Sequence, residues 1–201
     1  IDLSIEDFLN KNNTNLVGKF ANIASRSGPM LTKKLDSQLG QLDEAGTVLI
    51  NKLAAAKGQI IDNYENLNFA AVVREIVSLA DDANRYVEQN QPWVTVKTDL
   101  EKTRTTLTAT INAVRILTTY LKPILPKYAE KVEKFLNVDE LLFADVETQL
   151  LNHKINKFER LFDRIDISEV NAMIEESKET QSSGQQGSGG EPIAPECTIE
   201  D

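Results

Sequence analysis

The segment 69–89 constrains the fold of this chain more than any other part of its sequence. Its apolar residues recur every three or four positions in an unbroken series: Phe69, Val72, Val73, Ile76, Leu79, Ala80, Ala83, Tyr86 and Val87. This spacing matches the period of an α-helix, and a stripe of this width is stable only when other elements cover it. We therefore predict a helix over 69–89 within a larger helical assembly.

Similar spacing predicts helices on both sides of this segment. A capping-box pattern at Ser4 begins a first helix, which we expect to end at Gly28-Pro29 because proline disrupts a helix interior. Further helices are predicted over 30–39, over 48–67, from a second capping box at Thr98 to Pro123, and from Pro126 onward. The alternating pattern of β-strands is absent from the sequence, so the predicted fold is all-α, an antiparallel helix bundle.

The pattern changes after Asn137. Apolar residues continue over 138–180 at irregular spacing, which favours an extension that packs back on a surface, with a last short helix starting near Asp166. Residues 181–201 begin with a run of Gly, Ser and Gln that is typical of a flexible linker. The predicted organisation is a bundle over 1–137, an irregular C-terminal extension over 138–180 and a linker over 181–201.

The formal net charge of −9 argues at first against a nucleic-acid partner. Most of that charge belongs to residues 166–201, which hold nine acids and one base, whereas residues 1–165 hold 22 acids and 21 bases. A body this close to neutrality can carry a local basic face. Nucleic acid therefore stays among the candidate partners. No apolar run approaches the ~20 residues of a membrane span, so we expect no membrane partner.

Few residues suit catalysis, metal binding or disulfide formation. The single cysteine, Cys197, excludes an internal disulfide and fits a reducing cytoplasm. His153 is the only histidine, and we interpret it as a helix-end cap or a surface imidazole. Asp81 and Asp82 are adjacent, but neighbouring helix positions point about 100° apart, which favours a solvated face. We predict no catalytic residue and no metal site here.

The one tryptophan, Trp93, follows Pro92 just beyond the helix predicted over 69–89. Because proline cannot continue that helix, the indole is predicted to project from a helix end instead of joining a core layer. An exposed indole suits an unstacked nucleic-acid base. Most single tryptophans, however, are core anchors or lids.

Polar residues also line one edge of the first predicted helix. Their spacings of four, three and four place them together: Asn15, Lys19, Asn22 and Arg26. Amide and guanidinium groups suit base edges and phosphates. An ordinary polar shoulder is the commoner explanation for such an edge. If Trp93 lay beside it, the two features together would suit single-stranded bases.

Six motifs in order give a more specific signal: Asn22 to Arg26, Leu79 to Tyr86, Pro92-Trp93, Tyr120 to Pro126, Asn152 to Asn156, and Arg164 to Asp166. Together they resemble the anticodon-binding helical domain of bacterial methionyl-tRNA synthetases, over about residues 1–178. The resemblance implies a helix bundle that reads the methionine anticodon of tRNA. Asn22 and Arg26 match residues that hydrogen-bond anticodon bases, and Trp93 matches the aromatic on which a base stacks. The supporting residues would be Asn15, Lys19 and Pro92.

The resemblance also bears on a longer protein, which we expect because the chain opens at Ile1 instead of methionine. That protein would be a cytoplasmic methionine–tRNA ligase, using ATP and holding zinc. The HIGH and KMSKS motifs of the family's catalytic core are missing here, so this piece should be inactive alone and need no cofactor. The expected RNA partner is methionine tRNA. Residues 138–180 are expected to pack against the catalytic domain of the same chain. A second copy of the protein is expected to join through an OB-type module beyond the linker.

One position departs from the family pattern, since the residue before the Pro-Trp pair is often alanine and is Gln91 here. The three expected readers are still present. Two alternatives stay open from the sequence. One is a protein-docking scaffold with Trp93 as its anchor. The other is the equivalent domain of another class I synthetase.

Overall fold

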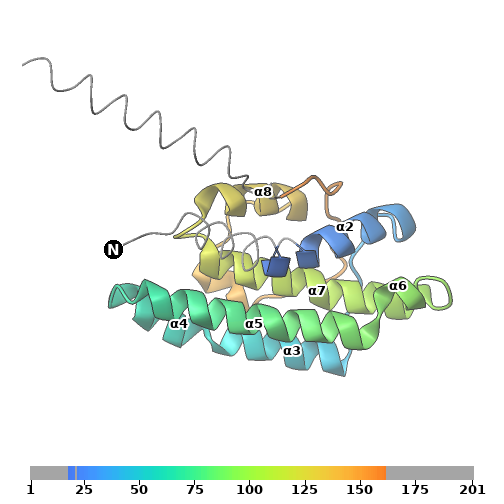
Figure 1. Ribbon diagram of the computed structural model, residues 1–201. Coiled ribbons are helices and arrows are strands. Elements are labelled where there is room, and N and C mark those ends of the chain that lie inside the picture. The colour runs from blue at the N-terminus through green and yellow to red at the C-terminus, as the bar shows by residue number, and fades with distance from the viewer. Residues whose placement is uncertain (1–17, 21, 162–201) are drawn as a thin grey trace, which may run out of the picture. The chain divides into compact units, whose positions relative to one another are not determined.

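The computed structural model describes residues 18–20 and 22–161, which lie within one compact unit, Asn10–Arg164. The α-helices are α2 (Asn22–Lys34), α3 (Glu44–Ala55), α4 (Lys57–Glu65), α5 (Phe69–Asn90), α6 (Pro92–Thr95), α7 (Leu100–Leu121) and α8 (Pro126–Leu136), followed by the 3-10 helix η2 (Phe143–Glu147) (Figure 1). Within the described residues the β-type pairing is one isolated bridge, Gln38 with Lys154. The predicted all-α fold class is confirmed.

Helix α7 is the centre of the bundle, and α2, α3, α5, α6 and α8 all pack against it. Every residue from Thr106 to Leu121 is buried. Buried threonine hydroxyls within α7 donate to carbonyl oxygens one turn earlier, as Thr110 does to Thr106 at 2.8 Å. These local bonds let a threonine-rich helix lie at the core with few unsatisfied polar groups.

The helix predicted over 69–89 is confirmed as α5, which ends one residue later, at Asn90. Most of its predicted stripe is buried against the other helices. Phe69 and Val73 in its first turns are the exceptions, with 49% and 37% of their surfaces exposed. The helix stops because Gln91 adopts the left-handed conformation, with φ 43°.

The predicted helix end at Gly28-Pro29 is wrong, because α2 continues through Pro29 to Lys34. A separate helix over 30–39 is therefore also wrong. Proline removes one backbone donor from the helix, but Gly28 allows unusually close packing beside it. A Cβ atom on Gly28 would lie 2.6 Å from Cδ2 of Phe158. Burial of Leu31 on the same helix adds to the apolar packing that offsets the lost bond.

Two other predicted boundaries also shift. The single helix predicted over 48–67 is wrong. Helix α3 starts at Glu44, and the helical structure is interrupted at Ala56, after which α4 begins. Asp43 caps α3 by accepting a hydrogen bond from Gly46 N–H at 2.7 Å. The capping residue of α7 is Asp99 instead of Thr98, and it accepts from Lys102 N–H at 2.9 Å. The spacing of apolar residues predicts which face of a helix is buried. The capping residues that set the helix ends lie outside that pattern, so the predicted boundaries are less accurate.

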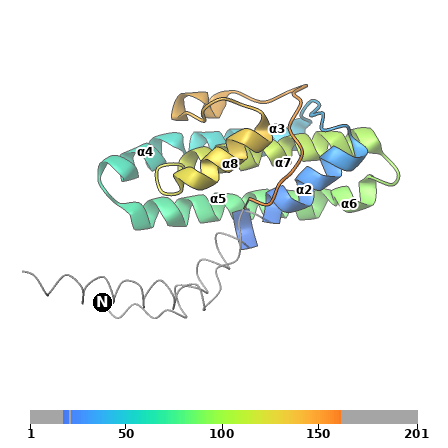
Figure 2. The same ribbon diagram turned by 90° about the horizontal axis from the view of Figure 1, so that it is seen from above.

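The chain after α8 lies across the bundle without forming another α-helix in the described residues (Figure 2). Its backbone is held by side chains of α7. The Arg115 guanidinium donates to the carbonyl oxygens of Asp145 and Thr148. The Asn112 amide accepts from Leu150 N–H at 2.8 Å and donates to the Leu150 carbonyl at 3.0 Å. The helix predicted near Asp166 and the linker over 181–201 lie outside the described residues.

Candidate nucleic-acid interface

Trp93 lies on α6, the short helix that joins α5 to α7. Its side chain leaves 39% of its surface exposed, and the neighbouring Val94 leaves 48%. Pro92, at the first position of α6, is buried. Trp93 therefore lies just beyond the end of α5, as predicted, and is partly exposed instead of being enclosed in a core layer.

Several contacts fix the helical turn that carries Trp93. The left-handed Gln91 redirects the chain after α5, and its carbonyl oxygen accepts from Val94 N–H at 2.8 Å. The hydroxyl oxygens of Thr95 on α6 and Thr103 on α7 lie 2.8 Å apart in a hydrogen bond. The indole is therefore presented on a short turn that is tethered to the central helix.

The two expected base readers on α2 are available to a ligand. Asn22 is half-buried at the start of the helix, and Arg26 is exposed one turn later. The helical spacing places both residues on one side of α2, as predicted. Within the described residues, no side-chain hydrogen bond or ion pair engages either of them.

Lys19, another predicted member of this edge, is engaged within the protein. The Lys19 ammonium is bound to Asp81, with Nζ 2.7 Å from Oδ2. The ammonium charge of Lys19 is therefore paired within the protein, and the pair links the segment that precedes α2 to helix α5. Asn84 reinforces this junction by donating to the Lys19 carbonyl at 3.3 Å. Asn15 lies outside the described residues.

Contacts at both ends of α2 bring it to the same end of the bundle as α6. Near its start, Lys19 contacts Asn84 on α5, which precedes Gln91 by about 10 Å of helix. Beyond its last turn, Arg104 on α7 donates to the Leu35 carbonyl at 3.3 Å. Arg104 follows Thr103, the partner of α6. Both ribbon views accordingly show α2 and α6 side by side (Figures 1 and 2).

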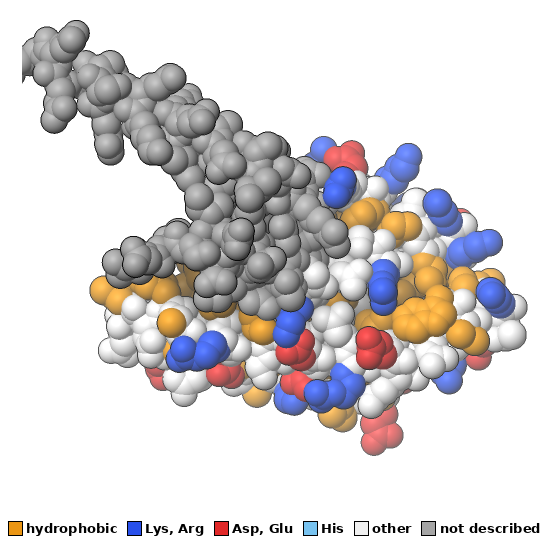
Figure 3. All heavy atoms as spheres, viewed as in Figure 1, with side chains coloured by type: hydrophobic (Ala, Val, Ile, Leu, Met, Phe, Trp, Pro, Cys, Tyr) orange, Lys and Arg blue, Asp and Glu red, His pale blue; other side chains and the backbone are white. Residues whose placement is uncertain are grey.

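The surface near α2 and α6 combines apolar and basic side chains. Figure 3 shows an apolar patch at this end of the bundle, with Lys and Arg side chains on either side of it. The exposed apolar residues of α6 are Trp93 and Val94. The exposed cations in the neighbouring segments of the protein are Arg26, Lys33, Lys97 and Lys102. Such a surface can stack a base and attract phosphate at the same time.

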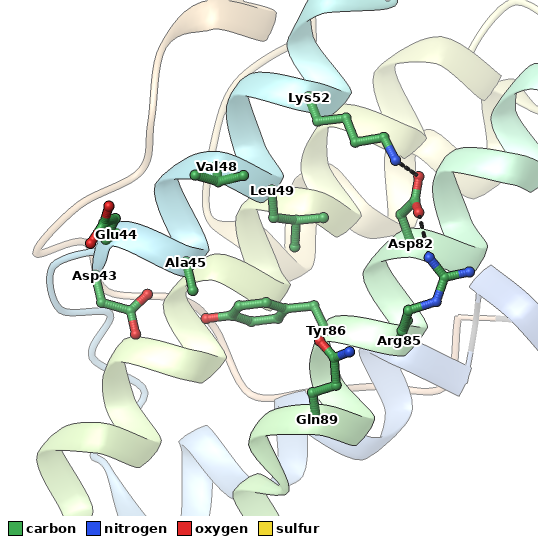
Figure 4. A pocket seen from close by; sticks show the side chains of 10 residues that line it. All are labelled: Asp43, Glu44, Ala45, Val48, Leu49, Lys52, Asp82, Arg85, Tyr86 and Gln89. Atoms are coloured by element: carbon green, nitrogen blue, oxygen red, sulfur yellow. Dashed lines mark hydrogen bonds and ion pairs between the residues drawn. The ribbon is translucent and has the colours of Figure 1, made fainter.

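The remaining candidates have structural roles. His153 Nε2 lies 2.7 Å from the carbonyl oxygen of Leu136, the last residue of α8, which confirms the helix-end interpretation. The solvated face predicted for the Asp81-Asp82 pair is wrong for Asp82, whose side chain is 16% exposed. Figure 4 shows Asp82 bound to Lys52 at 2.6 Å and to Arg85 at 3.1 Å, at the edge of an open groove between α3 and α5.

The described part of the chain holds neither a cluster of metal-ligating side chains nor a membrane-spanning helix. No three His, Cys, Asp or Glu side chains in residues 18–20 and 22–161 are grouped as metal ligands would be. Over the same residues, no helix is both long and apolar enough to cross a membrane.

The fold is that of an all-α anticodon-binding domain, as similarity to solved structures shows. Free methionyl-tRNA synthetase of Mycobacterium tuberculosis matches with a TM-score of 0.77 and 25% identity, over 82% of this chain and 35% of that one. The same protein in complex with methionyl-adenylate matches with a TM-score of 0.76 and 27% identity, over 81% and 34%.

Sequence relatives define the particular family. The model of the anticodon binding domain of methionyl tRNA ligase matches residues 37–179, so the chain belongs to this family. A methionine–tRNA ligase of Bdellovibrio bacteriovorus is 43% identical over 178 residues, which cover 89% of this chain and 26% of the relative. One of Chromobacterium violaceum is 40% identical over 206 residues, covering 100% and 30%. The chain thus spans less than a third of the length of these relatives.

Sequence reasoning missed two features of this site. It did not anticipate that Gln91 would be left-handed, because glutamine carries no preference for that conformation and proline at the next position only disfavours the right-handed helix. It also placed Lys19 on the polar edge as a supporting residue, since helical spacing does not reveal a partner 62 residues away in sequence. The Gln91-Pro92 pair that follows the helix predicted over 69–89 indicated only that the helix ends there and the chain turns.

Proposed function

We propose that this chain binds methionine tRNA and reads its anticodon at the surface formed by α2 and α6. The observation that supports this most strongly is the exposed Trp93 on a tethered turn of α6. Asn22 and Arg26 on α2 add to it, because their side chains make no hydrogen bond or ion pair among residues 18–20 and 22–161. Membership of the anticodon-domain family supports the same assignment.

Each residue has a distinct role in this proposal. The Trp93 indole stacks on one unpaired anticodon base, an interaction worth about 1–3 kcal/mol. The Arg26 guanidinium donates to a base edge or a phosphate, and the Asn22 amide both donates and accepts at a base edge. Pro92 supports the indole indirectly, because its ring is buried at the first position of α6. Lys19 acts indirectly by fixing the start of α2 against Asp81.

The longer protein is proposed to be a methionine–tRNA ligase of the cytoplasm. Its relatives carry that name and are more than three times as long as this chain. In that protein the ATP-dependent chemistry, and the zinc that the family resemblance implies, belong to the catalytic domain of the same chain. A second copy would associate through a further module beyond residue 201. This chain alone should bind tRNA without charging it.

Equilibrium titration tests the proposal directly. The wild-type chain and Trp93→Ala are each titrated with methionine tRNA and with the same tRNA carrying an altered anticodon. We expect the wild type to prefer the methionine anticodon, and Trp93→Ala to lose about 5- to 150-fold in affinity for it, the equivalent of the stacking energy. Arg74→Gln, a change of an exposed residue on α5, is the control. Equal affinities in all four combinations would refute the proposal.

A further inference from the structure

A second basic surface lies between α8 and the chain segment 156–161. A hollow of 540 Å³ separates them, and its charged lining consists of four cations and one acid: Lys131, Lys134, Lys157, Arg160 and Glu159. We call this hollow the basic groove. It is separate from the residues assigned to anticodon reading.

Helix α8 carries three lysines and two acids, Glu130 and Glu133. Lys127, Lys131 and Lys134 follow one another at helical spacing along the edge that borders the basic groove. Glu133 lies on the other edge, where its carboxylate accepts from Lys122 Nζ at 2.8 Å. Glu133 is therefore engaged elsewhere, whereas the exposed Glu130 lies among the three lysines and leaves them in excess on this edge.

The opposite wall of the groove is held in place by Phe158. Its ring packs edge-to-face on Phe135 of α8, with centroids 5.3 Å apart, and it also contacts α2 at Gly28. With Phe158 turned inward, Lys157 is left exposed at the groove. The one acid, Glu159, lies 3.6 Å from Lys134, and both side chains are about three-quarters exposed, with values of 76% and 75%. An ion pair so exposed is weak, and the four cations of the groove exceed its one acid by three.

Such a surface favours an anionic chain as its occupant. Several cations around one hollow repel one another, and a ligand with regularly spaced negative charges removes that repulsion. A sugar-phosphate backbone also gains from the counterions released when lysines replace them. Figure 2 shows α8, the segment 156–161, α2 and α6 in this order across one face of the bundle. The groove therefore lies on the same face as the proposed anticodon site.

From this arrangement we infer that the basic groove binds the sugar-phosphate backbone of the tRNA whose anticodon is read at α2 and α6. The inference rests on the proposed function for the identity of the RNA. The groove contributes affinity without base preference, because lysine contacts to phosphate carry no sequence information. Lys131 and Lys157 supply this attraction from opposite walls.

The test is a double variant, Lys131→Gln/Lys157→Gln, which removes one cation from each wall. The matched control is Lys52→Gln/Arg74→Gln, which removes two cations from α3 and α5, and in which Asp82 keeps its pair with Arg85 at 3.1 Å. Affinity for methionine tRNA and for an anticodon-altered tRNA is measured at several salt concentrations. Circular dichroism checks that each variant is folded.

We expect the groove variant to lose affinity several-fold and by the same factor for both tRNAs. The slope of log affinity against log salt should become shallower by roughly one for each lysine that contacts phosphate. The control variant should keep the wild-type slope. A groove variant with the slope and affinities of the control would overturn the inference, as would a loss confined to the methionine anticodon. If Trp93→Ala leaves anticodon preference unchanged while the groove variant flattens the slope, the anticodon site is refuted and the phosphate groove is supported.

Discussion

Gln91 and Trp93 illustrate how single residues shape the candidate site. A left-handed backbone costs a residue with a Cβ atom about 1–2 kcal/mol, yet Gln91 adopts φ 43°. That conformation ends α5 and turns the chain so that Pro92 is buried and Trp93 is exposed. The local strain is offset by contacts such as the hydrogen bond between Thr95 and Thr103. The position of the indole thus depends on a residue that makes no proposed contact with RNA.

At the same scale, Arg115 links the irregular chain to the core. It is 3% exposed, and burial lowers the pKa of its guanidinium while Asp145 opposes that shift. We predict that Arg115→Leu lowers the free energy of unfolding by about 3 kcal/mol, because several buried carbonyls lose a charged donor. Urea unfolding measures this change, with the surface variant Arg85→Gln as control. A loss no larger than that of the control would contradict the role of Arg115.

At the scale of elements, two helical glycines should respond oppositely to alanine. Gly28 on α2 has no room, since a Cβ atom would meet Phe158 at 2.6 Å, whereas Gly58 on α4 has no atom within 4 Å. We predict that Gly28→Ala destabilises the protein by about 1–3 kcal/mol through overpacking. Gly58→Ala should stabilise it by about 0.5–1 kcal/mol, because alanine restricts the unfolded chain and favours helix.

Thermal unfolding of both glycine variants checks this prediction. Adding Gly28→Ala to the truncation Phe158→Ala should restore part of the stability that Phe158→Ala alone loses. The reason is that the alanine methyl group and the Phe158 ring compete for one space. If Gly28→Ala stabilised the protein as Gly58→Ala does, the close packing of the segment 156–161 on α2 would be refuted. The wall of the basic groove depends on that packing.

For the whole molecule, buried tyrosines predict a loss of stability in alkali. Burial raises the pKa of Tyr64 and of Tyr128 to about 12, above the ordinary value of 10.0. The folded state therefore keeps protons that the unfolded chain releases above pH 10. Stability should stay constant below that pH and fall as the pH rises through 10 towards 12. Denaturant unfolding at pH 8, 10 and 11 tests this, and a flat profile would contradict it.

The sequence predicted the helical class well because apolar spacing depends directly on which face of a helix is buried. It predicted α5 and α8 closely for this reason, and it failed at Pro29, where packing of Phe158 overrides the local preference of proline. It predicted that Asn22 and Arg26 share one side of α2, since both lie on a single element. It could not predict the partner of Lys19 or the basic groove, because each joins segments distant in sequence.

The proposed anticodon site depends above all on the stacking of an anticodon base on Trp93. Because this is the only tryptophan in the chain, its intrinsic fluorescence reports on that one surface. The chain is titrated with an RNA stem-loop that carries the methionine anticodon, while binding is followed independently by mobility of the labelled RNA. We predict that tryptophan emission changes in step with binding and that a stem-loop with an altered anticodon gives a weaker change at the same concentration. Saturated binding with unchanged emission would contradict the account.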